Sequence, residues 1–434
     1  MSLLRRCVAV VLCGLVVFAS AHAQERPHAF EGATVYPIAD APIENGVVLV
    51  QNGTIQAVGP ADAVDIPSDA VRHDMSGKVL MPGIVDTHSH VGQVEGGDGS
   101  APMHPGVRSL DAVNIRHSSI NRARAGGITT VNVMPGSGHL LSGQTTYLKL
   151  RDVGTIEEAL FCDDPLTDIC GGLKMANGTN PQDDPPFPGS RAKSAALVRQ
   201  KLIEAQEYKA KMDAAESEDE MPTRDLGLEA LVEVLEGERI VQFHTHRHDD
   251  ILTVLRLKRE FDFPVVLHHV SEAWKVADEI AAADVPASII VLDSPGGKHE
   301  AVDIEYRNGA VLEGAGVDVA YHTDDLITDS RLFLRSAAFG VRAGMSREGA
   351  LEAMTLAGAR MLGLEDRVGS LEEGKDADLV VLSGDPLSVY TRVEQTWVEG
   401  QKVFDFANPE HRKFATGGYG AYDDGATLHH HRAH

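Results

Sequence analysis

The chain has 434 residues, of which 43% are hydrophobic and 24% are charged, a composition typical of folded globular proteins and not of disordered or fibrous chains. Its length exceeds the size at which one core usually stops growing, so we expect one large domain and a smaller one. The net charge of −25 at pH 7 argues against nucleic acid or an anionic membrane as a partner.

The N-terminus has the pattern of a secretory signal peptide. Arg5 and Arg6 precede an apolar run over residues 7–19, and small residues follow at the −3 and −1 positions of a cleavage site after Ala23. The run is shorter than the ~20 residues that a membrane-spanning helix needs, which disfavours the alternative of a membrane anchor. We expect residues 1–23 to be removed, leaving a periplasmic or secreted protein with no membrane association.

Strand-like runs occur near both ends of the mature chain. Residues 46–50 and 54–58 are joined by a turn that contains Asn-Gly, which predicts a β-hairpin. Similar runs lie at 377–382 and 394–404. We therefore expect the two ends to build one small β domain, with the long middle of the chain inserted between them.

The middle of the chain alternates between strand-like and helix-like stretches. The strand-like runs are 127–134, 241–244, 265–270, 288–292 and 317–321. The helix-like stretches are 192–214, 226–235, 251–261, 273–283 and 347–357. Repeated strand–helix units predict an α/β fold, either a parallel barrel or a doubly wound sheet, and periodicity alone does not choose between them.

The expected division of the chain has four parts. They are a signal peptide (1–23), a small β domain (24–80 and 366–406), a large domain (81–365) and a tail (407–434). The tail is rich in Gly, Tyr and His, and we expect it to be poorly ordered.

Two cysteines remain after removal of the signal peptide. Cys162 and Cys170 lie eight positions apart in a chain that we expect to reach an oxidising compartment. We predict a disulfide that closes a short loop; the alternative is two free thiols.

The strongest chemical signal is His88-x-His90, which follows a strand-like segment at 84–86. Side chains two residues apart on a strand project to the same face, so both imidazoles would point into one cavity. Two convergent neutral imidazoles suit a zinc-like ion. Such a pair also arises by chance in a chain with 20 histidines.

Further candidate ligands lie near the ends of later strand-like runs: Lys174, His244, His269 and Asp324. In a parallel barrel these strand ends meet at one face, where active sites are built. Taken singly, each has an ordinary alternative as a buried core histidine or a surface lysine. Their occurrence together, in this order, favours a metal site.

These motifs resemble the amidohydrolase superfamily, in its imidazolonepropionase-like and metal-dependent dipeptidase (prolidase-like) branch. The matching segments are 82–90, 126–130, 172–175, 244–246, 269–271, 323–324 and 369–379. The resemblance implies a (β/α)8 TIM-like barrel with a small β-sandwich domain formed by both chain ends.

The resemblance also implies a metal centre. The implied ligands are His88, His90, Lys174, His244, His269 and Asp324. The first-strand pair would bind the more buried ion, and His244 and His269 would bind a second one. Lys174 would bridge them after carboxylation by carbon dioxide, because an ammonium group has no lone pair. We therefore expect Zn²⁺ as the cofactor, as two bridged ions or as a single ion.

Some roles stay open. Candidate substrate contacts are His246, Arg247 and His322. His246 is the alternative to His244 as a ligand, and His268 is the alternative to His269. Asp86 is expected to orient a ligand histidine.

The expected reaction is hydrolysis of an amide bond in a dipeptide, an N-acyl amino acid or a related small molecule. Metal-activated water would attack the carbonyl carbon, and Asp324 would pass the proton to the leaving nitrogen. Two alternatives stay open: a cyclic-amide or lactone hydrolase with a mononuclear site, and a catalytically inactive metal-binding protein. The resemblance also implies a homo-oligomer.

Overall fold

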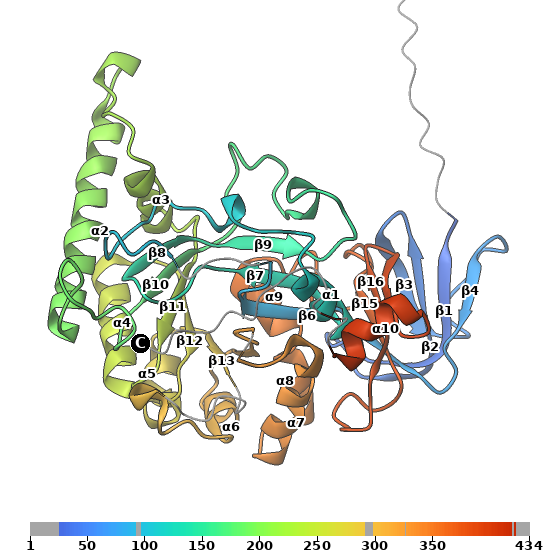
Figure 1. Cartoon of the computed structure of the whole chain (residues 1–434). Helices are drawn as coiled ribbons and strands as arrows, with labels where there is room; N and C mark the ends of the chain where they lie inside the picture. The colour runs from blue at the N-terminus through green and yellow to red at the C-terminus, as the bar shows by residue number, and fades with distance from the viewer. Residues whose placement is uncertain (1–25, 93–96, 291–297, 326, 419–420, 422–434) are drawn as a thin grey trace, which may run out of the picture.

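The structure is a computed structural model that describes residues 26–92, 97–290, 298–325, 327–418 and 421 (Figure 1). The predicted signal peptide and most of the predicted tail lie outside the described residues. The described strands form three sheets, one built from the two ends of the chain and two from its middle.

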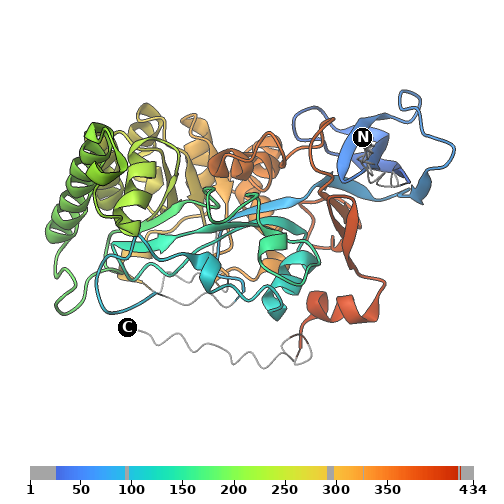
Figure 2. The ribbon, with the colours of Figure 1, turned by 90° about the horizontal axis from the view of Figure 1, so that it is seen from above.

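Both ends of the chain contribute to one sheet, which lies at one end of the molecule in Figures 1 and 2. Its strands are β1 (His28–Val35), β2 (Ile43–Gln51), β3 (Thr54–Pro60), β4 (Val71–Asp74), β5 (Val79–Pro82), β15 (Leu379–Leu382), β16 (Val393–Val398) and β17 (Gln401–Asp405). The order is β17-β16-β15-β5-β1-β2-β3, with β4 beside β1. Phe30, Ile55, Leu80 and Trp397 are buried in its core.

The pairing of this sheet tests two sequence predictions. The predicted hairpin is confirmed, because β2 and β3 pair antiparallel. The strand-like run predicted over 394–404 consists of two antiparallel strands, β16 and β17. The chain reverses at Glu399 and Gly400, both of which have a positive φ.

Two further sheets form the middle of the molecule. One has the order β6-β7-β9, and the other β14-β13-β12-β11-β10-β8. Their strands are β6 (Ile84–Ser89), β7 (Ile128–Val133), β8 (Leu141–Gln144), β9 (Thr146–Lys149), β10 (Leu173–Ala176), β11 (Val241–Thr245), β12 (Val265–His269), β13 (Ala287–Ile289) and β14 (Val319–Tyr321). β10 to β14 run parallel, and nearly every residue of these strands is buried, as expected for a parallel sheet covered on both faces.

Backbone hydrogen bonds connect these two sheets on two sides. After β14, the N–H of Asp324 donates to the carbonyl oxygen of His88 at 2.9 Å. At the other side, the N–H of Tyr147 donates to the carbonyl oxygen of Cys170 at 2.9 Å. The first contact brings the end of the last strand against the end of β6.

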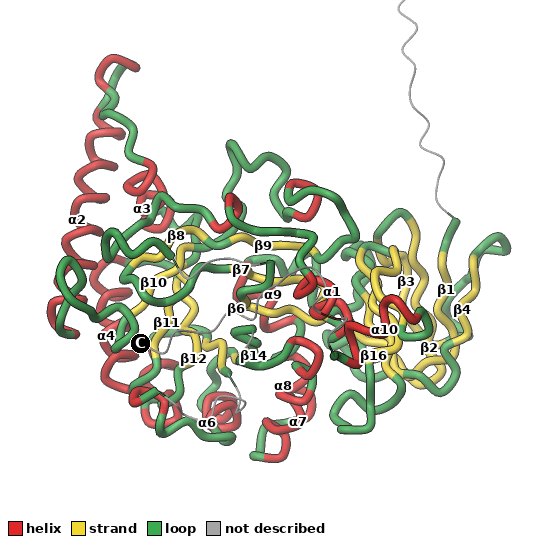
Figure 3. The backbone as a smooth tube through the Cα atoms, in the orientation of Figure 1, coloured by secondary structure: helices red, strands yellow, loops and turns green. Residues whose placement is uncertain are grey.

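Helices surround the central strands. Helix α2 lies at the end opposite the sheet that both ends of the chain form, which we call the two-ended sheet (Figures 1 and 3). They are α1 (Ser118–Ala125), α2 (Arg191–Ala214), α3 (Leu226–Leu235), α4 (His248–Phe261), α5 (Ala277–Ala282), α6 (Asn308–Gly314), α7 (Arg335–Arg342), α8 (Arg347–Glu352), α9 (Leu356–Leu362) and α10 (Pro409–Thr416). The molecule is thus α/β. Within the described part of the chain, every helix is too short or too polar to cross a membrane.

The predicted helices over 192–214, 226–235 and 251–261 correspond to α2, α3 and α4. Two other helices are interrupted. The stretch 273–283 begins as a 3-10 turn and becomes helical only at α5. The stretch 347–357 divides before Thr355, whose hydroxyl donates to the carbonyl oxygen of Leu351 at 2.8 Å. Such side-chain bonds compete with regular helix geometry.

The expectation that everything after Phe406 is poorly ordered is wrong for α10. The side chain of Asn408 accepts a hydrogen bond from the N–H of Glu410, and Pro409 occupies the first turn. Phe414 packs against the apolar cluster that contains Phe404. A capped helix with one apolar anchor therefore follows the last strand.

Candidate metal centre

The carboxyl ends of the parallel strands bring most of the candidate residues together. His244 on β11 lies beside His268 on β12, and His268 lies beside Ser288 on β13. Because these strands are parallel and in register, the residues at and just after these positions lie together at one edge of the sheet. The ends of β6 and β14 complete the group through the backbone contact of Asp324 with His88.

His90 and Asp324 face one another directly. Nε2 of His90 lies 3.0 Å from Oδ1 of Asp324, and Nε2 of His88 lies 3.5 Å from the same oxygen. Nδ1 of His90 donates to the carbonyl oxygen of Met134 at 2.7 Å. In a neutral imidazole this leaves a lone pair on Nε2, so two electron-rich atoms face each other, an arrangement that a shared proton or cation stabilises.

Lys174 is fully buried on β10. Its Nζ lies 3.2 Å from Nε2 of His88 and 3.0 Å from Sδ of Met134. Burial is the main cause that lowers the pKa of Lys174 to about 7. Burial therefore favours the neutral amine of Lys174 over its ammonium form.

His269 and His322 lie on the opposite side of the Asp324 carboxylate. Nδ1 of His269 is 3.9 Å from Oδ2 of Asp324 and 3.0 Å from Nε2 of His322. Nδ1 of His322 is 2.7 Å from the hydroxyl of Ser288. His322 thus contacts and orients His269. The ring of His268 instead forms a hydrogen bond of 2.6 Å with Gln242.

A third group contains His244, His246 and Glu300, and sequence reasoning missed the glutamate. All three side chains are buried, and Nε2 of His244 lies 3.8 Å from Oε1 of Glu300. Glu300 belongs to a 3-10 turn (His299–Ala301) and follows no strand-like run, so periodicity gave no signal for it.

Asp86 ties the first strand to the residue that precedes Asp324. The backbone N–H and the hydroxyl of Thr323 donate to its carboxylate at 3.0 and 2.6 Å. Burial raises the pKa of Asp86 to about 7, although the bonds from Thr323 oppose this shift.

Among the described residues, the side chain of Arg247 forms no hydrogen bond or ion pair with any of these groups. It precedes α4, and its guanidinium pairs with Asp249 at 3.0 Å. Its proposed contact with substrate therefore has no support from the described contacts.

The backbone is strained where the strands end. His269, Val270 and Asp324 have φ values of 69°, 37° and 49°. Non-glycine residues seldom adopt these values, least of all a β-branched residue such as Val270. Such strain concentrates at functional sites, where the surrounding structure fixes the side chains.

Burial favours the neutral forms of His88 and His244, whereas the contacts of Asp324 with His90 favour its ionised form. Burial, followed by the charge of Lys174, holds the pKa of His88 well below its usual range, and burial lowers the pKa of His244 to about 4. Burial alone would raise the pKa of Asp324, but its hydrogen bond and charge interaction with His90 hold the value well below the usual range. Neutral imidazoles and a carboxylate are the forms that ligate metal ions.

The residues present fit a metal ion. Several inward ring nitrogens and one carboxylate oxygen are buried without a hydrogen-bond partner among the described residues: His88 Nδ1, His244 Nδ1, His244 Nε2, His246 Nε2, His268 Nδ1 and Glu300 Oε1. Buried polar atoms are normally satisfied, so a cluster of exceptions indicates a missing ion or water. Independently of these atoms, three groups of side chains each offer ligand atoms within 4.8 Å of one another: His88–His90–Asp324, His88–His269–His322 and His244–His246–Glu300.

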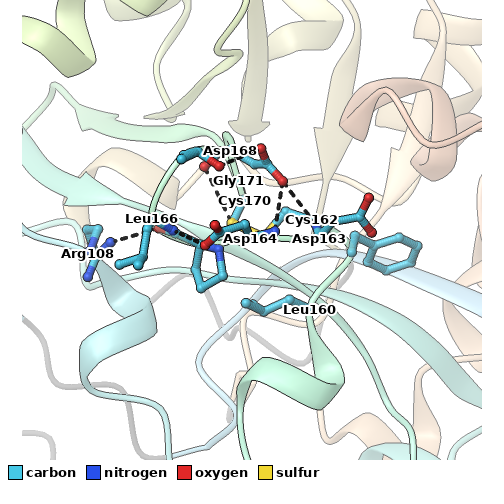
Figure 4. The surroundings of a disulfide bond; sticks show 12 residues. Arg108, Leu160, Cys162, Asp163, Asp164, Leu166, Asp168, Cys170 and Gly171 are labelled. Carbon is cyan, nitrogen blue, oxygen red and sulfur yellow. Dashed lines mark hydrogen bonds between the residues drawn. A yellow bond between two sulfur atoms is a disulfide. The ribbon is translucent and has the colours of Figure 1, made fainter. Parts of the chain in front are cut away.

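A disulfide between Cys162 and Cys170 closes the loop between β9 and β10 (Figure 4). The carboxylate of Asp168 folds back inside this loop and accepts the N–H groups of Asp163 and Asp164 at 3.2 and 2.8 Å. The crosslinked loop leads directly into the strand that carries Lys174.

Comparison with known proteins gives a consistent picture. Residues 212–404 match the model described as the amidohydrolase family. The crystal structure of an amidohydrolase from Thermotoga maritima is 35% identical and superimposes with a TM-score of 0.81 over 87% of this chain and 99% of that one. Amidohydrolase tasK of Hapsidospora irregularis is 30% identical over 83% of this chain, which spans only 40% of the relative's length. Imidazolonepropionase of Rhizobium rhizogenes is 26% identical, covering 80% of this chain and 89% of the relative.

An α/β fold with clustered histidines and an aspartate at its strand ends, and this similarity over nearly the whole of a solved structure, define the class. The chain belongs to the amidohydrolase family. It is a hydrolase of the kind that acts on carbon–nitrogen bonds, and its clustered histidines and aspartate have the spacing of metal ligands.

Proposed function

We propose that the protein hydrolyses an amide bond in a small molecule, such as a dipeptide or an N-acyl amino acid, with Zn²⁺ as cofactor. The observation that carries this proposal is the Asp324 carboxylate, which faces His90 at 3.0 Å and His88 at 3.5 Å. A divalent ion bound there supplies an activated water and polarises a carbonyl group.

The protein's own residues supply proton transfer and orientation. Asp324 is ionised at neutral pH because His90 stabilises its charge, so it can accept a proton and return it to a leaving nitrogen. The carbonyl oxygen of Met134 fixes the ring of His90, and Ser288 fixes His322, which in turn contacts His269. The site is thus oriented by groups that do not react themselves.

The strand arrangement supports the (β/α)8 barrel of the predicted fold. We propose that the β6-β7-β9 sheet and the six-stranded sheet close into one barrel, with the two-ended sheet as a β-sandwich domain. The hydrogen bonds of Asp324 to His88 and of Tyr147 to Cys170 support closure on both sides.

A cyclic-amide or lactone hydrolase with a single metal ion is the second candidate. It is favoured by Lys174, whose recorded partners are His88 and Met134 and which needs carboxylation before it can act as a ligand. Incubation with ¹³C-labelled bicarbonate tests this point. A carbamate resonance lost in Lys174→Met supports a pair of ions bridged by this lysine, and its absence from the native protein excludes such a bridge.

The decisive experiment measures amine release from a library of dipeptides and N-acyl amino acids by the zinc-loaded protein. We expect Asp324→Asn to lower turnover by about 10²–10⁴-fold, the usual contribution of a general acid–base group. The matched control is Asp318→Asn at the other end of the same strand, where Asp318 pairs with Arg360 at 2.7 Å. Near-normal turnover in Asp324→Asn contradicts the proposal, and activity on lactones or cyclic amides alone selects the second candidate.

We also propose a periplasmic or secreted location. The disulfide supports it, because such bonds persist in oxidising compartments. N-terminal sequencing of the exported protein should begin at Gln24, and a protein that keeps Met1 in the cytoplasm contradicts this location.

A further inference from the structure

The His244–His246–Glu300 group differs from the ligand set that the sequence led us to expect. His244 ends β11, His246 lies two residues further on, and Glu300 comes from the turn His299–Ala301. These three residues have exposed fractions of only 1%, 6% and 1%, and one ligand atom from each lies within 4.8 Å of the others.

His246 and Glu300 each have one atom held by a hydrogen bond, whereas the atoms that face the centre of the group are not held. Nδ1 of His246 bonds to the hydroxyl of Ser271 at 2.7 Å, and Oε2 of Glu300 accepts the N–H of Thr179 at 2.6 Å. Nε2 of His244, Nε2 of His246 and Oε1 of Glu300 have no hydrogen-bond partner within the described ranges. Burying a carboxylate oxygen and two ring nitrogens in this state is costly unless something binds all three.

A direct hydrogen bond within the group does not explain the geometry. The 3.8 Å between Nε2 of His244 and Oε1 of Glu300 exceeds hydrogen-bond length, while metal-bound ligand atoms are separated by such distances. Two imidazoles and one carboxylate are a common ligand set for zinc with an open fourth position.

The other residues expected to bind a second ion already have partners. Nζ of Lys174 contacts His88 and Met134, and Nδ1 of His269 lies 3.0 Å from His322. We propose that a second divalent cation is held by His244, His246 and Glu300, apart from the ion at His88, His90 and Asp324. Glu300, and not Lys174, then supplies the anionic ligand of the second ion.

This inference rests on the proposed metal-dependent function only for the presence of the first ion, and its test does not require activity. The metal content of purified apo-protein reloaded with Zn²⁺ is measured after dialysis, together with isothermal titration of Zn²⁺. We expect about two ions per chain in the native protein and about one in Glu300→Gln, with one affinity weakened by at least ~100-fold.

Glu272→Gln is the matched control. Glu272 is also buried and also pairs with a histidine, His248, at 2.5 Å, but it lies outside all three ligand groups. It should keep both ions, and circular dichroism checks that each variant is folded. His246→Asn removes a different ligand of the same ion and should also bind about one ion per chain.

Anomalous scattering from crystals of the native protein with Zn²⁺ tests the proposal independently of any variant. A peak among His244, His246 and Glu300 supports it. A second peak ligated by Lys174 without Glu300, or two ions retained by folded Glu300→Gln, overturns it. Loss of amide hydrolysis with both peaks present would refute the proposed function and leave this site intact.

Discussion

The carboxylate of Asp86 is held by Thr323 through both its oxygens, by the backbone N–H at 3.0 Å and by the hydroxyl at 2.6 Å. Asp86 lies two residues before His88, and Thr323 immediately precedes Asp324. One hydrogen-bonded pair therefore sets the position of the first-strand histidines relative to the last-strand aspartate.

Thr323→Val should weaken metal binding without removing a ligand. The substitution keeps the shape of the side chain but removes one bond to Asp86, and supporting bonds of this kind are worth about 10–100-fold in metal affinity. Competition with a chromophoric chelator measures the affinity. Thr328→Val is the control, because the hydroxyl of Thr328 is buried without a partner among the described residues. Equal affinities for the two variants would show that the Asp86–Thr323 contact does not position the site.

Removal of metal should lower thermal stability. An ion that binds only the folded chain adds about 2.7 kcal/mol when its free concentration is 100 times Kd. We expect a chelator to lower Tm at a fixed scan rate and Zn²⁺ to restore it. The change should be smaller in Asp324→Asn, which loses one ligand. An identical response in that variant would place the stabilising ion elsewhere.

Lys149→Met should destabilise the protein strongly. Lys149 is fully buried on β9, where it pairs with Asp376, with Asp378 at 3.4 Å and with Glu399 at 3.3 Å. Asp376 and Glu399 keep their ion pairs with Arg367 and Arg151, but the buried Asp378 loses its cation, a loss of about 3–5 kcal/mol. Lys413→Met, at an exposed pair on α10, should change stability by about 0.5 kcal/mol or less. Urea unfolding compares them, and similar midpoints would contradict a structural role for Lys149.

His73 should make stability depend on pH. Burial, followed by the charges of His28 and Lys402, lowers the pKa of His73 from 6.5 to about 4. The unfolded chain therefore binds more protons between these values, so the contribution of His73 is complete above about pH 6.5 and is lost as pH falls towards 4. His73→Gln should lose less stability than the native protein between pH 7 and pH 4.5, a difference on the order of 1 kcal/mol. Parallel losses in urea unfolding would exclude His73 as the cause.

The sequence allowed prediction wherever local spacing determines geometry. His88 and His90 lie two apart at a strand end, so the structure brings both to one carboxylate. The Asn-Gly turn and the amphipathic pattern of α4 are likewise local features. The motif at 369–379 was recognised in the sequence, but the role of its aspartates was not predicted. The structure shows that Asp376 and Asp378 form ion pairs with Lys149.

Other features depend on contacts that no local pattern encodes. Glu300 reaches His244 from a separate turn, and its partners lie far away in sequence. The short strands β8 and β9 were missed because four residues of mixed polarity are too few to show a strand period. Helix α10 was missed because its stability comes from the contact of Phe414 with the two-ended sheet and from the capping residue Asn408.

Because β5 pairs antiparallel with β15, the two-ended sheet can be completed only when synthesis of the chain is nearly finished. About 300 residues separate these strands, so their contact closes late and slowly. Until β15 emerges, β5 presents an unpaired edge of the kind that invites association with other chains. A growing chain therefore needs its N-terminal strands shielded by a chaperone or by delayed folding. A premature stop before Leu379 would remove β15, the strand that pairs with β5, so such fragments should aggregate even with the central strands complete.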